Sequence, residues 1–191
     1  MEIKTINCGF LETNCYIISD EDHAVVFDPE SETEKIISAI GSKKLMAVIL
    51  THGHFDHIGD VDKLCNITKA PLYIHAEDAE MLTDTHKNGS FLIPGLKVTC
   101  NTPSNTFTHG DKFTFGSINI EVIHTPGHTK GSCCFVCGDY LISGDTLFRN
   151  GIGRTDLYGG NYDKLVNTIQ ALFPRLSGKT IYPGHGRERN F

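Results

Sequence analysis

Short apolar runs separated by polar turns fill the first part of the chain. Residues 2–7, 14–18 and 24–27 are rich in β-branched and aromatic side chains, and the polar residues 20–22 separate the last two runs. This pattern predicts three consecutive antiparallel strands. A fourth run, residues 45–50, is apolar throughout and predicts a buried strand.

Apolar residues recur at helical spacing in four other segments. Residues 31–40 carry an isoleucine stripe, and Ser31 followed by Glu34 three residues later predicts a capping box at the start of that helix. Further helices are expected at residues 58–68, 76–82 and 161–173.

Strands and glycine-containing turns alternate in the second half of the chain. Two hairpins are expected, one from residues 111–115 and 117–123 and the other from residues 132–137 and 140–143. Single strands are expected at residues 71–75 and 179–182.

Residues 84–110 show the least regular pattern, and we interpret them either as a functional lid or as an irregular surface segment. No repeat or linker divides the 191 residues, so we expect one domain over residues 1–191. Both strand-rich halves contain helices, which predicts an α/β fold with two βα layers packed face to face.

The candidate chemistry is concentrated directly after the strand at 45–50, in the segment Thr51-His52-Gly53-His54-Phe55-Asp56-His57. Neutral imidazole and carboxylate oxygen are ligands for Zn²⁺ and neighbouring metals. His52 and His54 are two residues apart in a turning segment, so they can point to one side and bind one metal ion. Asp56 and His57 are adjacent at the start of a helix, and they are expected to project toward a second position.

Three later segments share one form, a strand followed by a glycine and a potential metal ligand: His128, Asp145 and His185. A glycine lets the backbone turn sharply off a sheet, so these side chains can meet the first cluster at one sheet edge. Asp145 is the expected bridge between two metals, because a carboxylate has two oxygens. One metal is expected to be held by His52, His54 and His128, and the other by Asp56, His57 and His185.

Composition limits the other possibilities. A formal charge of -6 without a basic cluster argues against a nucleic-acid partner. No apolar stretch has the length of a signal peptide or a membrane span, so a cytoplasmic protein without a membrane partner is expected. The 7 cysteines are scattered and imply no disulfide framework, and we expect Cys134 and Cys137 to be core residues. The histidines outside the ligand set are assigned to no metal.

The ligand motifs resemble those of the metallo-β-lactamase superfamily. Segments 11–16, 126–132, 143–148 and 151–156, together with Asp28-Pro29, resemble the short glyoxalase II-like hydrolases. The resemblance covers nearly the whole chain and implies a four-layer αββα sandwich with a dinuclear metal site at one edge. Two departures stand out: Glu30 replaces the usual glycine, and no segment of these 191 residues resembles the helical domain by which glyoxalase II helps to bind glutathione, so the resemblance by itself does not imply glutathione specificity.

These observations lead to a hydrolysis hypothesis. A water that bridges two divalent metal ions ionises near neutral pH and attacks an acyl carbonyl. Zn²⁺ is the expected metal, with iron or manganese as alternatives. Asp56 is expected to orient the nucleophile or to shuttle its proton. The resemblance to the short glyoxalase II-like hydrolases makes a thioester of the hydroxyacylglutathione type the expected substrate, and the thiolate of a thioester leaves without a strong general acid.

Three residues near the ligands are expected to contact the substrate: Arg154, Tyr158 and Lys130. Arginine can pair with a substrate carboxylate, and Arg154 lies within one of the motifs. The expected partner is a small-molecule acyl substrate, and the protein is expected to be a monomer or a homodimer.

Several other functions stay open at this point. A persulfide dioxygenase of the same superfamily uses two histidines and one aspartate on a single iron, and a hydrolase of another small ester or lactone would use the same ligands. A metal-stabilised binding module would need no catalysis. A flavodiiron-type oxidoreductase is disfavoured, because it would carry glutamate where His54 stands.

Overall fold

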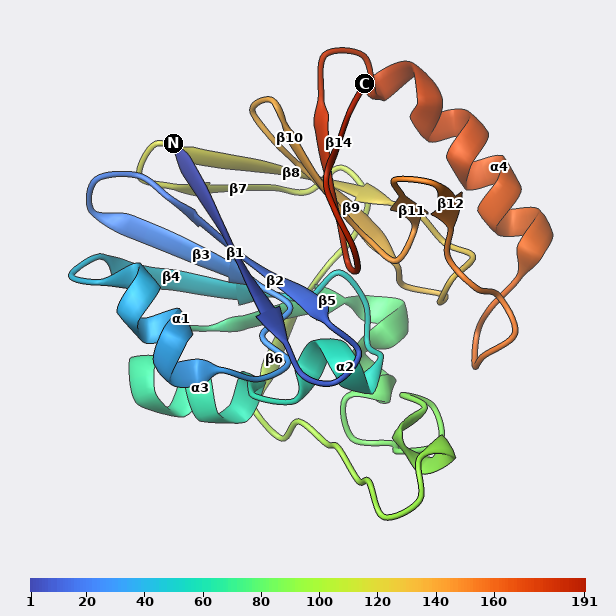
Figure 1. Cartoon of the computed structure of the whole chain (residues 1–191), viewed down its shortest axis with the longest axis horizontal. Coiled ribbons are helices and arrows are strands. Elements are labelled where there is room, and N and C mark those ends of the chain that lie inside the picture. The colour runs from blue at the N-terminus through green and yellow to red at the C-terminus, as the bar shows by residue number, and fades with distance from the viewer.

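Two six-stranded sheets lie face to face, and helices cover their outer faces (Figure 1). The computed structural model describes all 191 residues. In the first sheet, the first strand pairs antiparallel with the second, and the second pairs antiparallel with the third. The third to sixth strands pair with one another in parallel. Its strands lie in the order β1 (Glu2–Cys8), β2 (Thr13–Ser19), β3 (His23–Phe27), β4 (Lys44–Ile49), β5 (Leu72–His75) and β6 (Ser104–Phe107).

The second sheet is antiparallel except for one parallel pair, β10 with β13. Its strands lie in the order β14 (Arg189–Asn190), β13 (Thr180–Pro183), β10 (Tyr140–Gly144), β9 (Cys133–Cys137), β8 (Ile118–His124) and β7 (Lys112–Phe115). A separate two-stranded ribbon consists of β11 (Leu147–Phe148) and β12 (Gly151–Ile152).

The helices lie outside the two sheets. The α-helices are α1 (Thr33–Ile40), α2 (Phe55–Ile58), α3 (Val61–Thr68) and α4 (Tyr162–Leu172), and the 3₁₀ helices are η1 (Ala76–Met81), η2 (Ser90–Leu92) and η3 (Phe173–Arg175). In Figure 1, α1 and α3 lie on the side of the first sheet, and α4 lies on the far side of the second. None of these helices combines the length and the apolar character that crossing a membrane requires.

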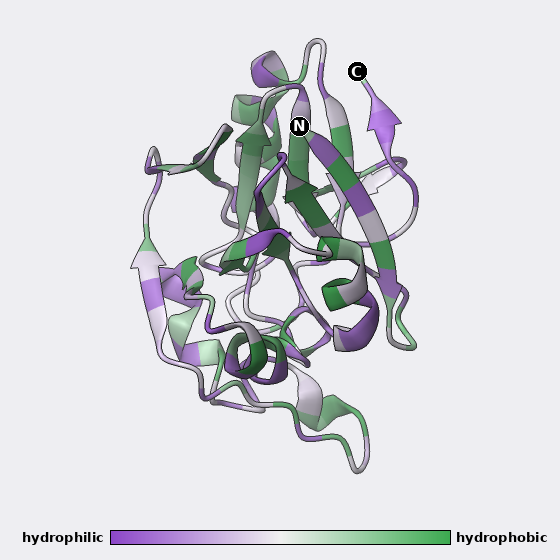
Figure 2. Ribbon diagram, turned by 90° about the vertical axis from the view of Figure 1, so that its left-hand side faces the viewer, coloured by the Kyte–Doolittle hydropathy of each residue, from purple (hydrophilic) through white to green (hydrophobic).

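Three apolar clusters account for this layering. Phe27 of the first sheet and Phe135 of the second meet between the sheets, with ring centres 5.2 Å apart. Ile36 and Leu64 pack on the outer face of the first sheet, and Leu172 packs on that of the second. The central strands are therefore buried on both faces and green in Figure 2, whereas the C-terminal edge strand is purple. The expected four-layer αββα sandwich is confirmed.

The prediction for the two cysteines of β9 is also confirmed. Cys134 packs in the cluster beneath α4, whereas Cys137 packs between the sheets. They face opposite sides because side chains alternate along a strand. Both thiols are buried and free, as expected for small core residues.

The predicted capping box at Ser31 is wrong. Helix α1 begins at Thr33, and the residue before it makes no capping hydrogen bond through its side chain. Instead, the Asp60 carboxylate accepts the Thr33 backbone N–H at 3.1 Å and the Thr33 hydroxyl at 2.6 Å. A side chain distant in sequence therefore satisfies the first turn, which local spacing cannot reveal.

Two further expectations need correction. The helix expected over residues 58–68 is split into α2 and α3, because the backbone N–H of Asp60 donates to Pro29 rather than within a helix. Residues 84–110 are not wholly irregular, because they contain β6, which pairs in parallel with β5. The sequence of β6 is mostly polar and exposed, with only Phe107 buried, so it lacked a strand signal.

Candidate metal centre

All seven predicted ligands lie at one edge of the sandwich, on segments that leave the ends of strands. His52 and His54 follow β4, and Asp56 and His57 belong to α2. From the second sheet come His128 after β8, Asp145 after β10 and His185 after β13. The two sheets thus contribute to a common site, as expected for ligands at the carboxyl ends of strands in α/β folds.

A glycine makes one of these turns possible. Gly144, just before Asp145, has φ of 48°, in the left-handed region where residues with a Cβ are strained. A Cβ added there would lie 2.5 Å from the hydroxyl oxygen of Thr51. The turn from β10 toward the site therefore requires the smallest side chain.

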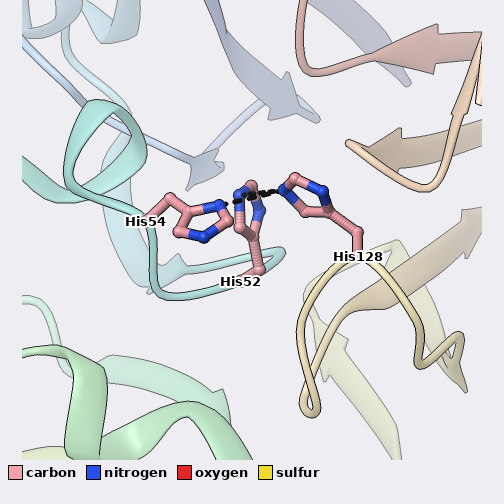
Figure 3. A group of neighbouring side chains, drawn as sticks. All are labelled: His52, His54 and His128. Atoms are coloured by element: carbon pink, nitrogen blue, oxygen red, sulfur yellow. Dashed lines mark hydrogen bonds between the residues drawn. The ribbon is translucent and has the colours of Figure 1, made fainter. Parts of the chain in front are cut away.

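The first group of ligands consists of three buried histidines that point toward one another (Figure 3). Nδ1 of His54 lies 2.9 Å from Nε2 of His128, which lies 3.2 Å from Nε2 of His52. Two nitrogens on one tetrahedral Zn²⁺, with bonds of 2.0–2.1 Å, would be about 3.3 Å apart. The spacing of these nitrogens therefore suits a single metal ion.

The second group consists of Asp56, His57 and His185. Oδ2 of Asp56 lies 3.3 Å from Nε2 of His185 and 3.7 Å from Nε2 of His57. Nδ1 of His57 lies 2.9 Å from a carboxylate oxygen of Asp28. An Nδ1–H that donates to Asp28 leaves the Nε2 lone pair free for a metal.

Asp145 lies between the two groups. Its Oδ1 is 3.6 Å from Nε2 of His57, and its Oδ2 is 3.5 Å from Nε2 of His128. One carboxylate therefore faces a ligand from each group. The arrangement is what a shared ligand requires, and its bridging role stays a prediction.

In two further candidate ligands, the ring nitrogen that faces away from the site contacts a backbone carbonyl oxygen. Nδ1 of His128 lies 2.8 Å from the carbonyl oxygen of Arg154, and Nδ1 of His185 lies 3.0 Å from that of Leu11. Such contacts fix both the tautomer and the direction of the ring. The Nε2 atoms of both histidines are thereby aimed into the site.

Several buried polar atoms of these residues have no hydrogen-bond partner, and this indicates whether the residues suit a metal ion. Nε2 of His54, Nε2 of His57 and Oδ1 of Asp145 are buried without a hydrogen-bond partner. Nε2 of His57 and Oδ1 of Asp145 lie 3.6 Å apart, and because burying such atoms unpaired costs free energy, this pair points to a group that both atoms bind. A donor set of imidazoles and carboxylates suits a divalent first-row metal ion.

The electrostatics of the site favour metal-binding protonation states. Burial lowers the pKa values of His52 and His54 well below the usual range, so both imidazoles are neutral. Burial alone would raise the pKa of Asp56, but His57 and His185 lower it. Burial opposes the charged form of His57 as well, yet Asp56 and Asp28 raise its pKa to about 10. A proton on His57 must therefore leave when a metal binds.

A cavity of about 490 Å³ opens onto the ligands. Besides the ligands, its polar lining residues are Asn88 and Arg154. Part of the wall comes from the segment 84–110, which the sequence left open as either a lid or an irregular surface segment. Its apolar lining residues are Leu11, Phe55, Leu92, Ile93, Phe148 and Leu157.

The three predicted substrate contacts lie in different places. Arg154 lines the cavity, where its guanidinium makes two hydrogen bonds of 2.7 and 2.8 Å to Asp156. The Tyr158 hydroxyl donates to Glu80 at 2.6 Å, and Lys130 lies over the Tyr158 ring. Neither Tyr158 nor Lys130 is among the residues that line the cavity. Their contacts with substrate stay predictions.

A second histidine cluster lies outside this site. The rings of His75 and His124 are stacked, with centres 4.1 Å apart, and Glu77 is close by. Nδ1 of His75 accepts the backbone N–H of Glu77, and Nε2 of His124 lies 2.8 Å from the carbonyl oxygen of Lys130. These bonds occupy one nitrogen of each ring, and the cluster contributes no residue to the cavity described above.

Two residues beside the ligands carried no clear sequence signal. The Thr13 hydroxyl lies 3.4 Å from Oδ2 of Asp56, and Thr13 also forms an isolated β-bridge with His185. The second residue is Asp28, whose carboxylate contacts Nδ1 of His57. Its position at the end of β3, beside β4, was the available signal.

The chain matches the model of the metallo-beta-lactamase superfamily over residues 8–185. The chain belongs to the metallo-beta-lactamase superfamily. It is 37% identical to the "Probable metallo-hydrolase YqgX" of Bacillus subtilis, with 98% of this chain and 92% of the relative covered. It is 31% identical to the "Hydroxyacylglutathione hydrolase GloC" of Haemophilus influenzae, covering 97% of this chain and 91% of the relative.

Solved structures of the superfamily agree. The BLEG-1 B3 metallo-beta-lactamase superposes with a TM-score of 0.92 at 34% identity, over 98% of this chain and 93% of that one. TTHA1623, solved in a di-iron-bound form, superposes with a TM-score of 0.85 at 29% identity, over 98% of this chain and 94% of that one. The chain is therefore a metal-dependent hydrolase of the superfamily.

Proposed function

We propose that this hydrolase cleaves a thioester of the hydroxyacylglutathione type, with two divalent metal ions in the site. The observation that carries the proposal is the convergence of seven candidate ligand side chains, five of which line a cavity with apolar walls. The likeness to the Haemophilus hydroxyacylglutathione hydrolase supports it. Two ions are proposed because two ligand groups lie side by side, with Asp145 facing both.

His52, His54 and His128 would hold one ion, Asp56, His57 and His185 the other, and Asp145 both. Zn²⁺ is the proposed metal, although the di-iron form of TTHA1623 makes iron the alternative to measure. When bound, the metal ions lower the pKa of water and polarise an acyl oxygen.

The residues of the chain supply the rest of the chemistry. Asp56 lines the cavity and stays ionised, so its Oδ2 can hold the attacking water in place and accept its proton. The Thr13 hydroxyl donates to this same oxygen and fixes its direction. Apolar walls formed by residues such as Phe55 and Leu157 exclude bulk water around the acyl group.

The absence of a strong proton donor favours a thioester over an amide. No lysine, tyrosine or cysteine lines the cavity, and the guanidinium of Arg154 is paired with Asp156. An amine leaving group must be protonated as it departs, whereas a thiolate is stable enough to leave without a proton. The chemistry of the lining residues therefore suits a substrate with a good leaving group.

Metal analysis combined with a substrate panel tests the proposal. The protein is purified without chelator, its metals are quantified, and hydrolysis of S-lactoylglutathione, apolar acyl thioesters, esters and lactones is measured. Two metals per chain and a thioester preference are expected, with Asp56→Asn lowering kcat by about 10²–10⁴-fold. A single iron per chain, together with oxygen uptake on glutathione persulfide, would overturn the proposal in favour of persulfide dioxygenation.

A further inference from the structure

Asp78 is a fully buried carboxylate in η1 that makes no hydrogen bond to a candidate metal ligand and does not line the cavity. Its Oδ2 accepts hydrogen bonds from the backbone N–H of Gly53 at 3.1 Å and from the Thr129 hydroxyl at 2.6 Å. Its Oδ1 accepts the backbone N–H of Gly131 at 2.7 Å. No lysine or arginine is among these partners. Such a group is costly to bury, so its hydrogen bonds must offset a large desolvation penalty.

The partners of Asp78 belong to the two loops that carry the first ligand group. Gly53 lies between His52 and His54 on the loop after β4 of the first sheet. Thr129 follows His128 on the loop after β8 of the second sheet. One carboxylate therefore connects the backbone of both loops within one residue of all three histidines.

Two glycines allow this close approach. A Cβ on Gly131 would lie 2.8 Å from the carboxyl carbon and from the backbone nitrogen of Asp78. A Cβ on Gly53 would lie 2.6 Å from the Cβ of Met81, in the same 3₁₀ helix as Asp78. Each loop is thus packed against η1 without room for a side chain, independently of the hydrogen bonds.

We propose that Asp78 is the positioning residue of the first metal position, because it sets the distance between His128 and the His52–His54 pair. The second ligand group has no contact with Asp78, so its metal affinity should not depend on this carboxylate. Partners behind metal ligands typically change metal affinity by about 10- to 100-fold when removed. The inference rests on the proposed metal centre but not on the identity of the substrate.

Cobalt binding separates the two positions. His185→Ala removes a ligand of the second group, so in this background Co²⁺ binding reports on the first group. His54→Ala removes a ligand of the first group, so in that background Co²⁺ binding reports on the second group. Co²⁺ is titrated into metal-free protein and followed by its visible absorption. Asp78→Asn should weaken Co²⁺ binding about 10- to 100-fold in the first background and less than about threefold in the second. Equal weakening in both backgrounds, or none in the first, would overturn the inference.

A matched control comes from Asp62, a carboxylate that bonds the backbone and hydroxyl groups of residues 101–102 and no ligand loop. Asp62→Asn should lower thermal stability and leave Co²⁺ binding unchanged in both backgrounds. If Asp78→Asn does not fold, Thr129→Val removes one donor and should weaken only the first position, by about two- to tenfold. Failure of the unsubstituted protein to bind Co²⁺ would instead contradict the metal centre itself.

Discussion

Asp28 contacts the His57 ring on the side away from the candidate metal position, with a carboxylate oxygen 2.9 Å from Nδ1 of the ring. The other carboxylate oxygen accepts the backbone N–H of Thr51 at 2.8 Å, which ties the end of β3 to the loop that follows β4. The backbone of Asp28 is left-handed, with φ of 51°. A residue with a Cβ seldom adopts this conformation, and aspartate is one of the few that tolerate it. The strand therefore ends in a way that directs this side chain at His57, a candidate metal ligand.

Asp28→Asn should weaken metal binding at the second position by about 10- to 100-fold. An asparagine amide that donates to Nδ1 would favour the tautomer with hydrogen on Nε2, the atom that must face the metal. Co²⁺ titration in the His54→Ala background measures the change. The exposed Asp139→Asn serves as control, and an affinity equal to that of the control would contradict the role assigned to Asp28.

Asp145→Ala should lower both metal content and hydrolytic activity, because this carboxylate faces both ligand groups. Chelation of the unsubstituted protein should abolish activity reversibly, with recovery on addition of Zn²⁺. Metal quantification and kcat are measured on the same samples. If the variant retains two metals and normal turnover, Asp145 is not a shared ligand.

His75 should make stability depend on pH below neutrality. Burial, together with His124, lowers the pKa of His75 to about 4, whereas an unfolded histidine titrates near 6.5. The unfolded state therefore binds a proton first, so the stability that neutral His75 provides is complete above about 6.5 and is lost as the pH falls toward 4. His75→Phe keeps an aromatic ring over His124 but removes this titration.

Thermal unfolding of metal-free protein at pH 7.5, 6 and 5 measures the effect. The unsubstituted protein should lose more stability over this range than His75→Phe does. The exposed His86→Phe should follow the unsubstituted protein. Parallel pH profiles for all three proteins would show that His75 does not contribute.

Phe135→Ala should lower the free energy of unfolding by about 3–5 kcal/mol. The Phe135 ring is fully buried between the sheets and lies 5.2 Å from Phe27 and 5.6 Å from Phe107, measured between ring centres. Its removal leaves a cavity that the two rigid sheets cannot close. Urea denaturation gives the value, and Phe91→Ala at an exposed position should cost less than about 1 kcal/mol.

The convergence of the seven candidate ligands was predictable because metal chemistry needs particular residue types at strand ends. His52, Asp145 and His185 each follow an apolar run, so the sequence indicated both the chemistry and the place. The central strands were predictable for a similar reason, since burial on both faces leaves a continuous apolar run.

What the sequence missed depends on contacts between distant segments. Asp78 stands in a polar stretch with no spacing that marks it, and its three partners lie 25 to 53 residues away. Asp60 caps α1 from beyond β4, and the edge strand β6 is held by backbone pairing rather than by apolar side chains. Tertiary structure decides such features, and local patterns carry little sign of them.

The candidate ligands span residues 52 to 185 and lie on segments that follow strands of both sheets, so metal binding would be linked to the stability of the whole fold. A metal ion bound by side chains from both sheets stabilises only the state in which the two halves are docked. At a free metal concentration 100 times its Kd, one ion would add about 2.7 kcal/mol to the folded state. Scarcity of metal in the cell would then lower the amount of intact protein as well as its activity.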